Sequence, residues 1–261
     1  MNSTEIVAYI GALAWIPHLA QWIYDYFTKP AIRIIPDRIA EIGHTVFGPI
    51  FNLRLSIDVS KKDTVIDFIG VELKHENGAT YNFHWMGMNE VFSEVIKVGS
   101  NPPNESQIVQ KNVTPIALKI SRLSLAEKYF RFQEKDFIDE NRKKFNALLK
   151  EIETAKKLKK EGKNIDFIWR NLNEYEHFLR EKFIWKAGTY SVNFLIRSPA
   201  KFDYIPQAAE FHLTQSDVDT LNSNFSEIGV FTQNIYNSIE ERNEPVKEPT
   251  WIWINPEIHK K

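Results

Sequence analysis

The chain contains no cysteine. A thiol nucleophile, a disulfide framework and a thiolate metal site are therefore all excluded. Its ten glycines are scattered and form neither a G-x-G-x-x-G nor a G-x-x-x-x-G-K pattern. Because these loops hold phosphates through closely spaced backbone amides, nucleotide binding of this kind is unsupported. The sequence predicts no cofactor.

An excess of charge of one sign is also missing, since 33 basic residues face 34 acidic ones. No global field attracts nucleic acid, which we do not expect as a partner. Hydrophobic residues make up 43% of the 261 positions, which is enough to fill a sizeable core.

Catalytic and metal-binding signatures are absent as well. His75-Glu76 begins like a zinc-protease motif but runs into the turn Asn77-Gly78, so no second histidine follows one helical turn later. The nearest approach to a polar cluster consists of Asp203, His212, Ser216 and Asp217. A capping box that starts at Thr214 accounts for part of it. We predict no catalytic residue and no metal ligand, which favours a non-enzymatic protein.

One apolar run, Ile6 to Tyr24, stands out from the rest of the chain. Its nineteen residues would span roughly 28 Å as a helix, close to the hydrocarbon thickness of a bilayer. Pro17 should kink this helix. We expect residues 1–28 to form a single-pass membrane anchor, with lipid contacts from Ile6, Ile10, Leu13, Trp15, Ile16, Leu19, Trp22 and Ile23.

The flanks of this run are asymmetric in charge. Lys29, Arg33 and Arg38 follow it, whereas the residues before it include Glu5 and no Lys or Arg. Cytoplasmic flanks carry the excess of Lys and Arg, so the bias places the rest of the chain in the cytoplasm.

Small and polar residues recur within the run at spacings of three and four: Gly11, Ala14, His18, Gln21 and Asp25. These positions share one face of a helix. In a membrane they would form a seam suited to self-association, which predicts a homo-oligomer. In a soluble protein the same seam would face water while the helix packs in the core. An interfacial helix and a signal peptide are further alternatives, although a signal peptide would need a basic n-region that is missing.

After Pro30 the pattern changes to the alternation of strands. Phe51 to Asp58 alternates apolar and polar residues without exception. Two further runs, 65–75 and 79–85, are joined by Glu76-Asn77-Gly78 and predict a hairpin. A left-handed Gly78 in this turn would set Val71 opposite Phe83 and Leu73 opposite Tyr81.

Heptad-like apolar spacing over about 134–184 predicts two antiparallel helices, separated by a turn at Glu161 to Asn164. Strand patterns return at 188–196 and 209–213, and a helix with a break near Gly229 follows. Residues 241–261 read as a polar linker and a short strand.

Taken together, these patterns predict a mainly β, α+β fold. Residues 29–240 would form an antiparallel, immunoglobulin-like sandwich with an inserted helical hairpin. The immunoglobulin comparison is an analogy, and fold does not fix function.

Two surfaces are candidates for contact with a protein partner or lipid headgroups. Arg142 to Lys163 holds nine Lys or Arg against three Glu, and Trp251 and Trp253 lie two residues apart near the end of the chain. The alternatives are a solvated helix face and tryptophans buried against the chain itself. The basic candidates are Lys143, Lys144, Lys156, Lys157, Lys159 and Lys160.

The sequence therefore favours a membrane-tethered, non-enzymatic interaction protein, a scaffold, sensor or effector, with a cytoplasmic β domain and an unidentified protein partner. The alternative is a soluble cytoplasmic enzyme or ligand-binding protein whose site is built from loops and whose N-terminal helix packs in the core.

Overall fold

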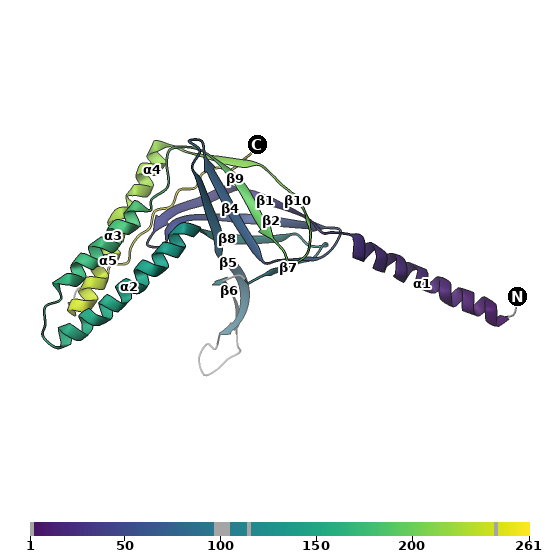
Figure 1. Cartoon of the computed structure of the whole chain (residues 1–261), viewed down its shortest axis with the longest axis horizontal. Helices are drawn as coiled ribbons and strands as arrows, with labels where there is room; N and C mark the ends of the chain where they lie inside the picture. The colour runs from purple at the N-terminus through teal and green to yellow at the C-terminus, as the bar shows by residue number, and fades with distance from the viewer. Residues whose placement is uncertain (1–2, 97–104, 114–115, 243–244) are drawn as a thin grey trace.

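The computed structural model describes residues 3–96, 105–113, 116–242 and 245–261, and their side chains except those of residues 3–13, 25 and 89–112. The fold is mixed α/β and is dominated by one large curled sheet with several helices (Figure 1).

Ten strands belong to this sheet, in the order β10-β1-β2-β8-β5-β4-β9-β11-β12, with β6 paired to β5. All neighbours are antiparallel except β1 and β10. The bounds are β1 Ala31–Thr45, β2 Gly48–Ser60, β4 Phe68–His75, β5 Thr80–Ile96, β6 Glu105–Val113, β8 Ala126–Glu134, β9 Gly188–Arg197, β10 Asp203–Ile205, β11 Ala209–Leu213 and β12 His259–Lys260. A separate two-stranded sheet pairs β3, Thr64–Ile66, with β7, Leu118–Ile120.

The predicted sandwich is not confirmed. A sandwich requires two packed sheets, whereas hydrogen bonds link all the longer described strands into one sheet. Local alternation identifies strands but does not say how they join, and the immunoglobulin-like topology stays a prediction.

The strand predicted from alternation at Phe51 to Asp58 is confirmed as part of β2. Phe51, Leu53, Leu55 and Ile57 are fully buried, while Arg54 between them is exposed. Because successive strand residues point to opposite faces, these four side chains line the concave core of the curled sheet.

The predicted hairpin register is confirmed too. Val71 lies opposite Phe83 and Leu73 opposite Tyr81 in the β4–β5 pair. Gly78 has a φ of 92° and closes the turn in a conformation that side-chain-bearing residues rarely adopt.

Helices form a second layer beside the sheet. They are α2 Lys135–Lys160, α3 Asp166–Glu181, α4 Gln215–Asn222 and α5 Asn224–Glu240, with α2 and α3 in the segment where heptad spacing predicts two helices. A core of their own holds α2, α3 and α5 together. At its centre Phe137 stacks on Phe178, with 5.7 Å between ring centroids, and Phe137 also covers the bare backbone of Gly48.

His44 joins the sheet to this helical layer. Its Nε2 donates a hydrogen bond to the Leu179 carbonyl oxygen at 2.9 Å, and its Nδ1 is buried without a partner. Phe183 and Phe225 meet the ring edge-on. Burial therefore lowers the pKa of His44 to about 4, which keeps the ring neutral.

The C-terminal segment differs from the predicted short strand. Residues 250–255 contain only an isolated bridge, Ile254 to Ile42, and the short strand β12 comes later. The reason is a contact between distant parts of the chain: the Asn224 side chain holds both backbone groups of Ile252 at 2.8 Å, so these groups do not join a ladder. The last long helix breaks at Ser223 rather than near Gly229.

Candidate membrane anchor and binding surfaces

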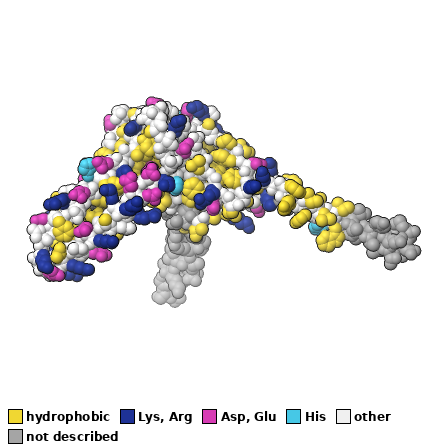
Figure 2. All heavy atoms as spheres, in the orientation of Figure 1, with side chains coloured by type: hydrophobic (Ala, Val, Ile, Leu, Met, Phe, Trp, Pro, Cys, Tyr) yellow, Lys and Arg dark blue, Asp and Glu magenta, His cyan; other side chains and the backbone are white. Residues whose placement is uncertain are grey.

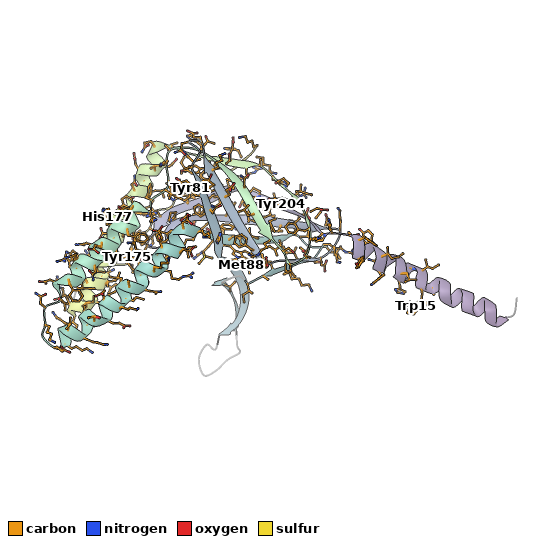
Figure 3. The ribbon with its side chains drawn as sticks, in the orientation of Figure 1. Trp15, Tyr81, Met88, Tyr175, His177 and Tyr204 are labelled. Carbon is orange, nitrogen blue, oxygen red and sulfur yellow. The ribbon has the colours of Figure 1, made fainter. Side chains whose placement is uncertain are left out.

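Helix α1, Ser3–Phe27, projects away from the body and lies on the side opposite the helical layer (Figure 1). Every described side chain from Ala14 to Phe27 is exposed. Trp15 is 67% exposed, Leu19 55% and Trp22 66%, and Figure 3 shows Trp15 with no other element beside it. The described part of α1 is therefore not a core helix.

The exposed side chains of α1 are strongly apolar (Figure 2). Full burial of one large apolar side chain is worth about 1.5–3 kcal/mol. Trp15, Ile16, Leu19, Trp22 and Ile23 are each half exposed or more, so covering all five would release about 5–9 kcal/mol. A helix with this surface gains far more from lipid or another helix than from water.

Not all of the predicted anchor can be placed in this way. The side chains of Ile6, Ile10, Leu13, Gly11 and Asp25 lie outside the described residues. Over the part of the chain that the structure describes, no helix is both long and apolar enough to cross a membrane.

Three members of the predicted seam are described, and Ala14, His18 and Gln21 are all exposed on α1. The His18 ring packs edge-on against Trp15, with 5.9 Å between centroids. The seam is therefore open to a second helix along its described length.

Two of the three cations that follow α1 lie near its base. Lys29 is exposed in the connection to β1, and Arg33 pairs with Asp58 of β2 at 2.7 Å. Arg38 is exposed further along β1. Figure 2 shows Lys and Arg side chains gathered where α1 meets the body.

The basic run lies on α2, but its cations do not share a face. With 3.6 residues per turn, the six candidate lysines are distributed around most of the helix. Lys159 pairs with Glu240 of α5 at 3.0 Å, and the Lys144 ammonium lies 5.0 Å from the centre of the Phe178 ring. Lys143, Lys156, Lys157 and Lys160 are exposed. This arrangement is typical of a solvated helix that covers its own core.

The two tryptophans near the C-terminus separate instead of forming one anchor. Trp251 is half-buried against the core of the helical layer, whereas the Trp253 ring lies over the backbone of Gly43 in β1. Both therefore contribute to the chain's own packing.

Trp253 also forms one wall of an open cavity of about 450 Å³ on the outer face of the sheet. Glu41, Asn52 and Arg131 follow one another across β1, β2 and β8 in register. The cavity is lined by Glu41, Phe47, Ile50, Asn52, Met86, Gly87, Arg131, Phe132, Gln133 and Trp253.

Some polar groups of this cavity have hydrogen-bond partners and others have none among the described residues. Glu41 Oε1 accepts hydrogen bonds from Asn52 Nδ2 at 2.7 Å and from the Tyr129 hydroxyl at 2.9 Å. Burial and the bond to Glu41 raise the pKa of Tyr129, so its hydroxyl stays a donor. Asn52 Oδ1 is buried with no partner, and no described residue pairs with the exposed Arg131 guanidinium. Among the described residues that line the cavity, no nucleophile is paired with a base.

The polar residues weighed from the sequence do not assemble into a site. Asp203 pairs with Lys61 at 3.6 Å, Asp217 closes a capping box with Thr214, and His212 contacts Thr189. The described residues contain no cluster of His, Asp or Glu able to hold a metal ion.

Comparison of this chain with protein families, with curated proteins and with solved structures finds no match.

Proposed function

We propose that this chain is a membrane-tethered, non-enzymatic interaction protein. In this proposal α1 inserts into the bilayer as a single-pass anchor, although no described helix is by itself long and apolar enough to cross one, and the β-rich body lies on the cytoplasmic side. One observation carries it: the described half of α1 presents large apolar side chains to its surroundings and packs on no part of the body.

The magnitude supports lipid as the partner of α1. The 5–9 kcal/mol available from five described side chains is comparable to the membrane affinity of one acyl chain, before residues 3–13 contribute. Lys29, Arg33 and Arg38 give the orientation, because positive flanks are retained on the cytoplasmic side.

Once α1 is in the bilayer, Ala14, His18 and Gln21 would face a neighbouring copy of the helix. Polar groups in hydrocarbon gain from pairing with each other, which supports a homo-oligomer. Replacing His18 and Gln21 with leucine should abolish self-association without changing the thermal stability of the body.

The tether is tested by flotation of the full chain with phosphatidylcholine vesicles, followed by carbonate washing. A lysine within the apolar span costs about 3 kcal/mol, so Leu19→Lys should weaken partitioning about 100-fold. Leu149→Lys makes the same change at an exposed position of α2 and should leave flotation unaltered. Recovery of the full-length protein in the soluble fraction would refute the tether.

A second candidate function, ligand binding by the body, is favoured by the cavity beside Trp253. The Arg131 guanidinium, which pairs with no described residue, suits a carboxylate, and Phe47 and Trp253 suit an aromatic ring. Titration with benzoate and phenylacetate, followed by tryptophan fluorescence, tests it. Binding should be lost in Arg131→Ala and kept in Arg170→Ala on α3. If the tryptophan fluorescence of the unaltered chain shows no saturable change with either ligand, this function is excluded.

A further inference from the structure

Two surface turns meet at one end of the body. Lys61-Lys62 connects β2 to β3, and Ser121 to Ser124 connects β7 to β8. Pairing of β3 with β7 brings the two turns side by side. The Arg122 amide donates to Asp63 Oδ1 at 2.9 Å, and its guanidinium Nη1 donates to the Lys61 carbonyl oxygen at 3.4 Å. We call these two turns the basal turns.

The basal turns lie at the base of α1. Ser60, the residue before Lys61, pairs with Ala31 at the start of β1, only four residues after the end of α1. Lys61 Nζ reaches Asp203, whose amide donates to the Pro30 carbonyl oxygen at 2.9 Å. If α1 enters a bilayer, this end of the body meets the headgroups.

The composition of the basal turns is unusual for a solvated surface. Lys61, Lys62 and Arg122 are exposed cations. Between and beside them, Leu123 is 88% exposed and Leu125 is 54% exposed. Asp63 is exposed as well, so the two turns together carry three cations and one carboxylate. An exposed leucine beside a net positive charge matches both layers of a membrane surface, since the cations meet anionic headgroups and the leucine enters the interface.

We propose that the basal turns bind anionic lipid headgroups and seat the body on the membrane surface. This inference rests on the proposed function, because α1 delivers the turns to the bilayer. Charge complementarity and position decide for lipid over a protein partner: the cations gather at the point where the chain would enter the membrane. A basic patch beside a hydrophobic anchor adds electrostatic affinity for anionic lipid, which is the effect that we assign to the basal turns.

The magnitude follows from the charges. Each Lys or Arg near an anionic surface strengthens binding about fivefold. Reversing two of these charges in Lys62→Glu/Arg122→Glu should therefore weaken flotation on phosphatidylserine-containing vesicles at least about 25-fold. The matched control, Lys143→Glu/Lys144→Glu on α2, should leave it unchanged, and neither pair should alter flotation on pure phosphatidylcholine.

Because the chain has no cysteine, Ser124→Cys allows one environment-sensitive fluorophore to be placed at the tip of the basal turns. The full-length labelled protein is mixed with each kind of vesicle, and flotation and emission are measured on the same sample. The fluorophore should shift to the blue with phosphatidylserine present, and added salt should reverse the shift.

Failure of this inference is distinguishable from failure of the tether. Protein that floats on both kinds of vesicle with unshifted emission overturns the basal-turn site and leaves the tether standing. An equal blue shift of the emission on both kinds of vesicle shows that the anionic headgroup is not what the basal turns bind, and overturns this inference. Protein that floats on neither overturns both proposals.

Discussion

Lowering the pH should destabilise the body through His44. In the folded chain its Nδ1 is buried without an acceptor, between Phe183 and Phe225. Protonation would place an N–H donor and a positive charge there, so burial lowers the pKa of His44 from 6.5 to about 4. The unfolded chain takes up the proton near its ordinary pKa. Stability is therefore fully present above about pH 6.5 and falls as the pH drops toward 4.

The size of the loss follows from the two pKa values. Between pH 7 and pH 4 the protonation of His44 lowers the free energy of unfolding by about 3 kcal/mol. This is a large part of the 5–15 kcal/mol by which a typical domain is stable. His44→Gln isolates this contribution, because a glutamine amide can still donate to the Leu179 carbonyl oxygen but does not titrate.

The assay is urea unfolding of both chains at pH 7 and pH 4. Burial raises the pKa of Glu134, so protonation of this carboxyl stabilises the fold as the pH falls, which opposes the effect of His44. Its contribution is the same in both chains and cancels in the comparison. The free energy of unfolding should fall by about 3 kcal/mol more in the natural chain than in His44→Gln. An equal pH dependence in the two chains would show that the buried ring does not govern it.

Three further substitutions test the helical core, the hairpin turn and the hydrogen bonds that hold the C-terminal segment. Phe137→Ala removes the ring that stacks on Phe178 and should cost about 3–5 kcal/mol in urea unfolding; a cost below about 1 kcal/mol would contradict the helical core. Gly78→Val puts a β-branched side chain at a φ of 92° and should cost about 1–2 kcal/mol, whereas an unchanged midpoint would contradict the turn. Asn224→Ala removes both hydrogen bonds to Ile252 and should speed proteolysis of the C-terminal segment; an unaltered cleavage rate would count against that clasp.

Local sequence patterns predicted the elements whose structure is decided locally. Phe51 to Asp58 became a strand because its alternation matches the two faces of a sheet, and Gly78 set the hairpin register through its turn. The capping box at Thr214 and Asp217 is present as predicted. In each case the residues that decide the outcome are neighbours in the chain.

Features that depend on distant neighbours were missed. Nothing local pairs β2 with β8 or β4 with β9, so the curled single sheet was not anticipated. The cavity was missed for the same reason, because Glu41, Asn52 and Arg131 come from three strands and meet only after pairing. The basal turns were equally hidden, because they meet only after β3 pairs with β7.

The exposure of α1 is a different case. Its apolar composition was plain from the sequence, but a core helix and a membrane helix share that composition. Only the arrangement of the body distinguishes them, and the described side chains from Ala14 to Phe27 lie clear of it.

The central claim is that lipid surrounds α1, and depth-dependent quenching tests it most directly. Leu19→Cys gives one label in the middle of the described part of α1, again because no other cysteine is present. With vesicles, the label should be quenched by nitroxides attached to the acyl chains and protected from aqueous iodide. A label that iodide quenches equally well with and without vesicles would contradict the account.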